Sequence, residues 1–358
     1  MLRYVVPTTD YRTYSRNAAA ESPDAAAMRR HADAGNSVID PLRASIALPF
    51  HHVLYPRGFA THIKSNEPAI VRAAEQSWAS FQQRFREAPI EVRFIVSDFP
   101  TRRRPPCPIF RAQGNLLTIV ADAHNFACCD LAAGFGFACV TKAAVTNRNY
   151  IRYHFLESMV YVLLDTQHVV DLHAACLIRD GCGILLVGES GVGKSCFAYA
   201  CARRGWTYVS DDSSSLPRRR PGRLVLGNPH AFRFRPSVRT LFPELNGHVK
   251  VRNGKPTFEV RTEQLSNIKV AAECRVDYIV FLNRLEDESA PVRLVPVSRE
   301  ESLRRLFQNN IFPTELSIHE ERLQAIERLL EAQLFQLTYR DLDPAIDLLE
   351  QVLRRGRS

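Results

Sequence analysis

Apolar residues in the first 148 positions alternate between two periods. From Pro68 to Ala88 they recur every three or four residues, with Trp78, Phe81 and Phe85 in register, which predicts an amphipathic helix. Short apolar runs around it predict strands over 45–50, 90–96, 116–121 and 137–144. Three prolines in 101–108 (TRRRPPCP) predict a turn or linker. We therefore expect an α+β module over 41–148, preceded by a loose tail over 1–40 that lacks apolar periodicity.

Beyond position 148, strand and helix patterns alternate. The predicted helices cover 149–165, 194–204, 299–310, 314–334 and 344–353. The predicted strands cover 169–178, 184–187, 207–210, 277–282 and 335–339, and 218–223 (RRRPGR) predicts a basic turn. The expected fold class is therefore α/β, with a second domain over 149–298 and a closing helical and strand segment over 299–358.

Composition excludes several classes of protein. Basic residues outnumber acidic ones by 47 to 38, a formal charge of +9, but the excess is spread arginine and no helix-turn-helix or aromatic-basic platform accompanies it, so we expect no nucleic-acid partner. No apolar run approaches the roughly 20 residues that span a bilayer, so we expect no membrane insertion. Nine cysteines without a C-x-x-C pair, and the lack of a signal-peptide pattern, favour reduced thiols in a cytoplasmic protein.

One segment satisfies a phosphate-binding motif. The run GESGVGKS matches G-x-x-x-x-G-K-[ST] between a predicted strand and a predicted helix. Its glycines permit backbone conformations in which N–H groups turn inward around an anion, and the helix N-terminus adds a favourable dipole. The predicted ATP-binding residues are Gly188, Glu189, Ser190, Gly191, Val192, Gly193, Lys194 and Ser195. Lys194 is expected to reach the β- and γ-phosphates, and Ser195 to offer its hydroxyl to Mg²⁺.

Two adjacent carboxylates and a histidine accompany this loop. Asp211 and Asp212 follow a predicted strand directly, which suits one of them to Mg²⁺ binding and the other to accepting a proton from a hydroxyl. The sequence leaves open which does which. His173 lies on the strand before the P-loop strand, where it could orient an Asp or relay a proton.

Two arginines are further candidates for contacts with the acceptor or the transferred phosphate. Arg233 and Arg235 alternate with Phe232 and Phe234 in FRFR, so on a strand both arginines face one side. They could stabilise charge on the transferred phosphoryl group. Surface arginines flanking a strand are the alternative interpretation.

Together, LHAAC, GILLVGESGVGKS and RGWTYVSDDSS resemble the catalytic domain of the HPr kinase/phosphorylase family over about 169–216, and YRDLDPAIDLL resembles the C-terminal end of related proteins. The resemblance implies a fold like that of phosphoenolpyruvate carboxykinase over the P-loop domain, ATP and Mg²⁺ as cofactors, and a serine hydroxyl on a protein or peptide as acceptor. It implies phosphate and Mg²⁺ binding by Lys194 and Ser195. It also implies catalytic roles for Asp211, Asp212 and His173, and a possible homo-oligomer.

The leading hypothesis is therefore a kinase that transfers the ATP γ-phosphate to a hydroxyl of a protein or peptide. The alternatives are a small-molecule kinase or a ribosomal-peptide tailoring kinase on the same fold, and a nucleotide-sensing regulatory protein with little turnover. The sequence does not separate them, because acceptor pockets lie outside the motif.

Overall fold

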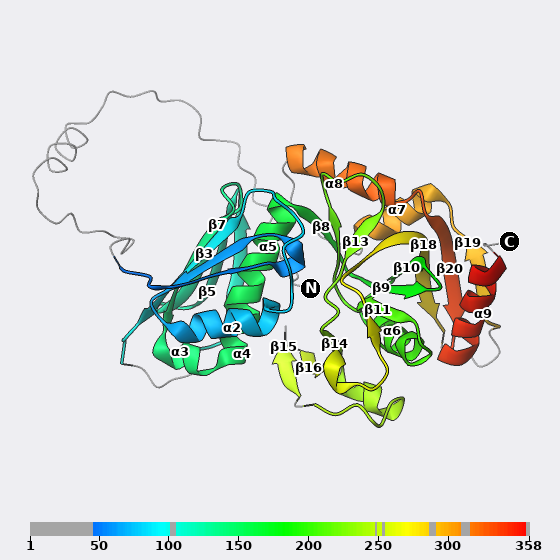
Figure 1. The fold of residues 1–358 in the computed structure, drawn as a ribbon, viewed down its shortest axis with the longest axis horizontal. Helices are drawn as coiled ribbons and strands as arrows, with labels where there is room; N and C mark the ends of the chain where they lie inside the picture. Colours follow the sequence, from blue (N-terminus) through cyan, green and yellow to red (C-terminus); the bar gives the residue numbers. More distant parts are fainter. Residues whose placement is uncertain are drawn as a thin grey trace, which may run out of the picture.

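The chain folds into two units that each contain strands and helices, which confirms the expected α/β class (Figure 1). The expected tail over 1–40 and the first half of the expected turn 101–108 lie outside the described residues. We call 46–167 the N-terminal unit and 169–355 the P-loop unit. The computed structural model describes residues 46–100, 105–247, 249–252, 255–285, 291–308 and 316–355.

The N-terminal unit is built on a seven-stranded sheet in the order β1-β2-β3-β7-β6-β5-β4. Strands β2, β3 and β7 run parallel, and the other neighbouring pairs are antiparallel. Side chains alternate between a buried and a more open face, as period-two sequences require. The strands are β1 (Phe50–Leu54), β2 (Thr61–Ser65), β3 (Ile90–Ser97), β4 (Ile109–Gln113), β5 (Leu116–Asp122), β6 (Asn125–Asp130) and β7 (Phe135–Thr141).

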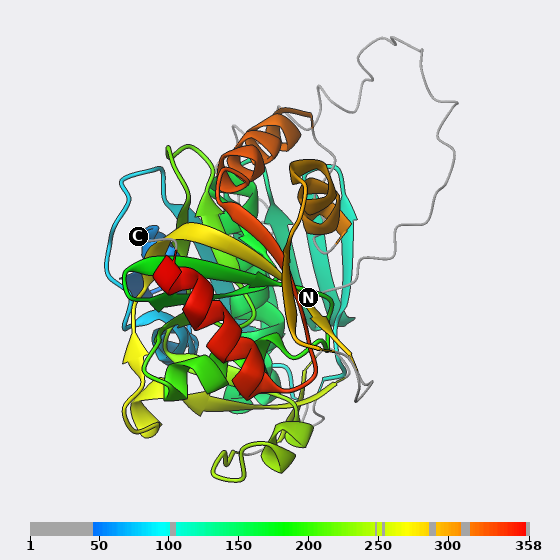
Figure 2. The ribbon, with the colours of Figure 1, turned by 90° about the vertical axis from the view of Figure 1, so that its right-hand side faces the viewer.

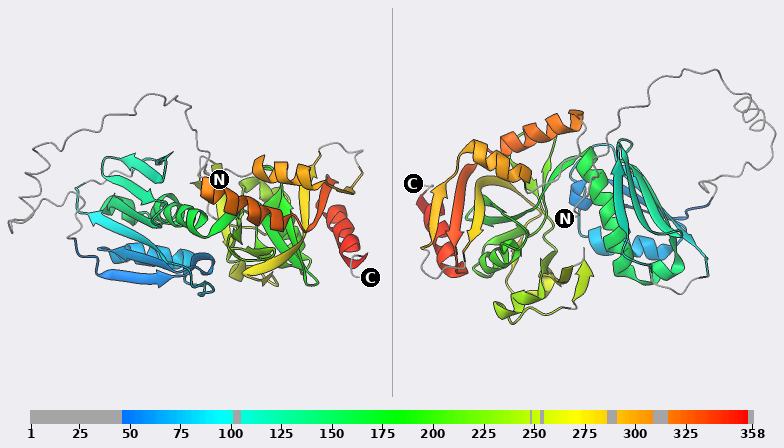
Figure 3. Two further views of the ribbon diagram at one scale, coloured as in Figure 1. Left: turned by 90° about the horizontal axis from the view of Figure 1, so that it is seen from above. Right: turned by 180° about the vertical axis from the view of Figure 1, so that it is seen from behind.

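Helices cover the face of this sheet that is turned toward the P-loop unit (Figures 1 and 3). A nearly continuous helical segment packs Met159, Val160 and Leu163 into the same core as the sheet. The expected helix 149–165 thus completes the core of the N-terminal unit, although its sequence position suggested the following domain. The helices are α2 (Pro68–Trp78), α3 (Lys142–Thr146), α4 (Arg148–Ile151), a π-helical turn (Arg152–Leu156) and α5 (Glu157–Gln167).

Three predicted elements of this unit need correction. The helix expected over 68–88 ends at Trp78, because the backbone N–H groups of Arg84 and Phe85 bond to the carbonyl of Gly58 instead. The strand expected over 137–144 ends at Thr141, whose hydroxyl caps α3. The first strand is 50–54, not 45–50, and β2, β4 and β6 were not predicted.

The P-loop unit holds a ten-stranded sheet, in which β18 pairs in parallel with both β10 and β20. The carboxyl ends of these three strands therefore meet at one edge of the sheet, where ligands of open α/β sheets bind. The path runs β17-β11-β9-β10-β18-β13-β12-β8, with β20 and then β19 joined at β18. The strands are β8 (Val169–Leu172), β9 (Ala174–Arg179), β10 (Cys182–Val187), β11 (Thr207–Ser210), β12 (Ser214–Pro217), β13 (Leu224–Leu226), β17 (Lys269–Val270), β18 (Glu273–Arg284), β19 (Arg293–Pro296) and β20 (Gln333–Tyr339).

Helices cover both faces of this sheet (Figure 2). Along β18, Val280 packs into the core under α6 (Lys194–Arg203) and α9 (Leu342–Arg355), and Ile279 and Phe281 pack under α7 (Arg299–Gln308) and α8 (Leu316–Leu329). The helix expected over 314–334 ends at Leu329, because Gln333 already begins β20. The helix expected over 299–310 is α7, which the structure describes as far as Gln308.

A small sheet extends the P-loop unit below the junction of the two units (Figure 1). It has the order β14 (Ala231–Phe234), β16 (Lys255–Arg261), β15 (Lys250–Arg252) and is antiparallel. Phe232 and Phe234 are buried in the core shared with α6, so the other face of β14 is turned away from that core. In the described part of the chain, no helix combines the length and the apolar character needed to cross a membrane.

Candidate active site

The predicted phosphate loop connects β10 to α6, as the motif requires. Gly191 and Gly193 have φ values of +104° and +103°, which side chains rarely adopt. Gly193 is the N-cap of α6, so the loop ends on the positive end of a helix dipole. The local geometry is therefore that of an anion-binding loop.

Lys194 lies under this loop and is only 5% exposed. Its Nζ donates to the carbonyl oxygens of Gly188 (2.7 Å) and Glu189 (3.2 Å). Burial lowers the pKa of Lys194 to about 8, and the negative charges of Asp212 and Asp211 partly offset that effect. The structure thus brings the predicted lysine and the predicted carboxylates within electrostatic range of each other.

Asp211 is buried at the end of β11. Its Oδ1 accepts a hydrogen bond from the Tyr208 hydroxyl at 3.1 Å, and its Oδ2 accepts one from the backbone N–H of Arg233 at 2.9 Å. Burial, reinforced by the neighbouring charge of Asp212, raises the pKa of Asp211 to about 6. A carboxyl with that pKa is ionised at neutral pH and still accepts a proton readily.

His173 meets Asp212 at a break in the sheet. The single strand expected over 169–178 is two strands, because β8 pairs with β12 while β9 pairs with β10 and β11, and His173 is the residue between them. Its Nδ1 lies 3.0 Å from Oδ1 of Asp212 and 3.1 Å from the backbone oxygen of the same residue. This histidine therefore fixes the orientation of the more exposed carboxylate.

The two candidate arginines take different places. Arg235 lies beside the phosphate loop, with its guanidinium 3.4 Å from the Ser190 hydroxyl. The side chain of Arg233 instead contacts Glu157 (3.3 Å) and Glu259 (3.4 Å). Only its backbone N–H reaches the carboxylate pair.

Arg57, which the sequence did not indicate, enters the site from the N-terminal unit. It is 6% exposed and has a φ of +56°, an uncommon value for a residue with a side chain. Its guanidinium donates to Asp171 at 2.9 Å and also to the hydroxyls of Ser213 and Ser215. Arg57 thereby ties the segment after Asp212 to the N-terminal unit. The only sequence signal was a Pro-Arg-Gly turn, which has no specificity for a site.

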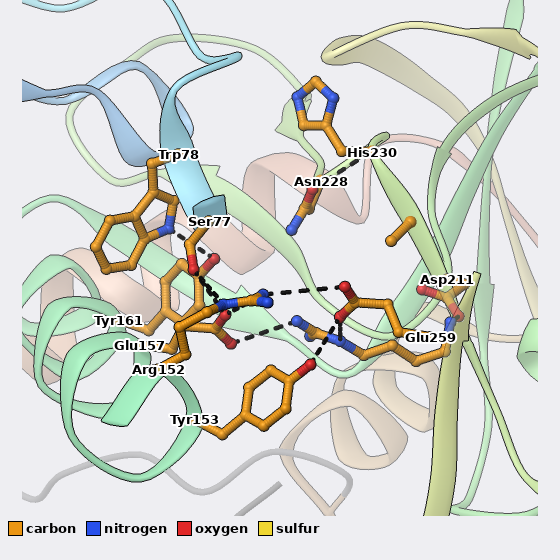
Figure 4. A network of polar contacts seen from close by, with 12 residues as sticks. Ser77, Trp78, Arg152, Tyr153, Glu157, Tyr161, Asp211, Asn228, His230 and Glu259 are labelled. Carbon is orange, nitrogen blue, oxygen red and sulfur yellow. Dashed lines mark hydrogen bonds and ion pairs between the residues drawn. The ribbon is translucent and has the colours of Figure 1, made fainter. Parts of the chain in front are cut away.

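Four alternating charges, which we call the charge quartet, bridge the two units (Figure 4). Arg152 and Glu157 come from the N-terminal unit, and Arg233 and Glu259 come from β14 and β16. The closest contacts around the ring are 2.9, 3.3, 3.4 and 3.9 Å. Tyr153 donates to Glu259 at 3.3 Å, and Ser77 bonds both Arg152 and Glu157.

The π-helical turn supplies two members of this network. Arg152 and Tyr153 both lie in it, and Figure 4 shows both side chains directed toward Glu259. Such turns occur mostly as single insertions in α-helices and are frequent at functional sites. The sequence pattern of 149–165 gave no sign of it, because apolar periodicity predicts a helix without its hydrogen-bond register.

Two cavities lie at the junction of the units. The smaller, of about 140 Å³, is lined by Arg57 and by His173, Asp211 and Asp212. The larger, of about 300 Å³, is lined by the charge quartet and by α2. Asn228, Ala231 and Arg233 line both, so the two cavities adjoin.

The donor set fits a magnesium ion only in company with phosphates. In the described ranges, no group of three or more His, Cys, Asp or Glu side chains is arranged to hold a metal ion. Mg²⁺ characteristically uses one or two carboxylates together with substrate phosphates and water. Asp211 and Asp212 supply the carboxylates of such a set, and Ser195 lies next to Lys194 in the first turn of α6, so these residue types suit the ion expected with ATP.

Comparisons with known proteins give limited guidance. No family model matches the sequence, and no curated protein matches it. Among solved structures, the Hpr(Ser) kinase/phosphatase from Coxiella burnetii is similar over 52% of this chain and 95% of its own chain, with 18% sequence identity and a TM-score of 0.29. The likeness is distant, and the chemistry of this chain rests on its own residues.

Proposed function

We propose that this chain is an ATP- and Mg²⁺-dependent kinase that transfers the γ-phosphoryl group of ATP to a hydroxyl, that of a serine in a protein or peptide. One observation carries the proposal. A phosphate loop with a buried lysine lies within electrostatic range of a buried aspartate whose pKa is raised to about 6. Nucleotide binding alone requires no such base, so this pair favours catalysis over a nucleotide sensor.

The loop would bind the triphosphate through its inward N–H groups and Lys194. Arg235, beside Ser190, would add positive charge next to the transferred group. Mg²⁺, when bound, would neutralise charge on the β- and γ-phosphates. The protein's own contribution is thus to hold the phosphates and to stabilise charge that develops during transfer.

We assign the role of general base to Asp211 and that of cation ligand to Asp212. Asp211 is buried and has a pKa close to neutrality, which suits a general base. Asp212 is more exposed, at 38% of its side chain, and His173 holds it in one orientation. The acceptor hydroxyl would lose its proton to Asp211 as its oxygen attacks the γ-phosphorus in line with the leaving oxygen of ADP.

Transfer from γ-labelled ATP tests this proposal. The full chain is incubated with Mg²⁺ and a protein extract of its own organism, in parallel with Lys194→Ala and with the exposed control Lys142→Ala. We expect a discrete labelled product with the wild type and the control and none with Lys194→Ala. Equal labelling with Lys194→Ala contradicts the proposal, and bound ATP without any labelled product indicates a nucleotide sensor.

A further inference from the structure

The larger cavity has the position expected of an acceptor site. It lies between α2 and the π-helical turn on one side and β14 and β16 on the other. The adjoining smaller cavity is lined by Asp211 and Asp212, and Arg233 contacts both cavities and Asp211. The larger cavity therefore adjoins the cavity that the proposed base lines.

The phosphate loop does not compete for this space. In the described part of the chain, the lining of the two cavities includes no residue of 188–195. Lys194 nevertheless interacts electrostatically with both carboxylates. Nucleotide and acceptor would thus reach Asp211 and Asp212 by separate routes, as an in-line displacement requires.

The wall of the larger cavity carries balanced charge. Three arginines and three glutamates line it, and the quartet among them is already paired internally. A ligand with a net charge would lose hydration on entry and meet a wall whose charges sum to zero. A ligand with no net charge but many hydrogen-bonding groups would find both donors and acceptors, including Asn228 and Ser77.

The volume limits the size of that ligand. A cavity of about 300 Å³ is at the lower end of the range for small-molecule sites. It holds about one or two amino-acid residues, so a larger acceptor must enter it with a single side chain or an extended segment. A hydroxyl that reaches Asp211 through it must belong to a small or flexible molecule.

We propose that this cavity is the acceptor site and that it takes a hydroxymethyl-bearing amino-acid unit of no net charge, either free serine or a serine in a flexible peptide segment. The inference rests on the proposed function and names its substrate class. It excludes anionic acceptors and serines fixed on the surface of a folded carrier. The charge quartet is then the part of the wall that selects against net charge.

A matched series of acceptors tests the charge rule. L-Serine is a zwitterion, blocked N-acetyl-L-serine amide is neutral, D-glycerate carries one negative charge and ethanolamine one positive charge at neutral pH, and all four present a hydroxymethyl group. With the full chain, ATP and Mg²⁺, we expect kcat/KM for serine or for its blocked amide to exceed that for glycerate and ethanolamine at least tenfold. A higher kcat/KM for L-serine indicates the free amino acid as the acceptor, and a higher kcat/KM for the blocked amide indicates a serine in a peptide. The inference is overturned if neither serine nor its blocked amide is phosphorylated, or if kcat/KM does not depend on the net charge of the acceptor.

Two variants test the location. Ser80 is exposed and lines the cavity, whereas its neighbour Ala79 is exposed and does not. Ser80→Trp should raise the acceptor KM at least tenfold and leave the KM for ATP unchanged, and Ala79→Trp should behave as wild type. A third variant tests the charge rule: Glu259→Gln leaves the wall with one net positive charge, so kcat/KM for glycerate should rise relative to that for serine. Equal acceptor KM values for the two tryptophan variants overturn the inference.

These results separate the inference from the proposed function. If Lys194-dependent labelling of an extract protein occurs but none of the four acceptors is used, the kinase assignment stands and the acceptor class is wrong. If no transfer occurs at all, calorimetric titration of the full chain with L-serine and the blocked amide decides on the cavity. Binding that Ser80→Trp abolishes supports the site as a ligand site, and no binding overturns it.

Discussion

Replacing Asp211 by asparagine should stabilise the P-loop unit, and the gain should increase as the pH rises. Burial raises the pKa of this carboxyl from 3.8 to about 6. That shift corresponds to about 3 kcal/mol of ionisation cost in the folded state. Because the folded pKa lies above the unfolded one, the cost is absent below about pH 4 and complete above about pH 6. Asparagine carries no charge and removes this cost.

Urea unfolding at pH 5 and pH 8 measures the effect. The chain has two tryptophans, one in each unit, so in a Trp78→Phe background the buried Trp206 reports on the P-loop unit. About half of the ionisation cost is already present at pH 5, so the advantage of Asp211→Asn should grow by about 1.5 kcal/mol between the two pH values. Asparagine forms weaker hydrogen bonds than aspartate, which shifts the stability difference equally at both pH values and leaves its change with pH unaltered. Asp98→Asn, at an exposed carboxyl, is the control.

An advantage of Asp211→Asn that stays constant or shrinks toward pH 8 would refute the reasoning. It would mean that burial does not raise the pKa of the Asp211 carboxyl toward neutrality, and the argument for Asp211 as the general base would fail. The same variant should transfer phosphate at least about 100-fold more slowly, since general-base catalysis contributes that much or more. A more stable but inactive protein is therefore the expected result.

Three further predictions follow from the same geometry. The kcat/KM for transfer should rise through about pH 6 as Asp211 ionises and fall through about pH 8 as Lys194 loses its proton, and a flat profile from pH 5 to 9 would contradict both assignments. Arg57→Ala should lower the free energy of unfolding by about 2 kcal/mol and slow transfer, because Asp171 loses its buried partner; unchanged urea unfolding would contradict this. Gly183→Ala should cost about 3 kcal/mol by urea unfolding, because a Cβ there would lie 2.0 Å from a carbonyl oxygen of β18; an unchanged midpoint would show that the strands separate freely.

Local sequence predicted the phosphate loop and its flanking elements because their residues are contiguous, whereas β15, β16, β17 and β19 were not predicted. The motif, the strand before it and the helix after it are adjacent in the chain, so one window contains them all. Asp211 and Asp212 are likewise adjacent to each other at the end of a strand that was predicted. The functional roles of these residues stay predictions, but the structure brings them together with His173.

The rest of the site depends on contacts that no window contains. Arg57 and Asp171 are 114 positions apart, and Arg233 and Glu157 are 76 apart. Their pairing follows from how the two units pack, which hydrophobic periodicity does not determine. The same holds for the seven-stranded sheet, where β3 lies beside β7 and not beside β4. The helix expected over 68–88 failed for a related reason, since Phe85 is buried by stacking on Phe59 and not by helical packing.

The charge quartet has a consequence for how this protein can change over evolutionary time or in the laboratory. Each unit contributes one arginine and one glutamate that pair within the unit, and the contacts of Arg233 with Glu157 and of Arg152 with Glu259 join the two halves. A recombinant that exchanged the N-terminal unit for an unrelated one would leave Arg233 and Glu259 facing a surface with no matching ion pair. The two units are thus not interchangeable modules. A successful chimaera has to transplant Arg152 and Glu157, together with the π-helical turn that holds Arg152 in place.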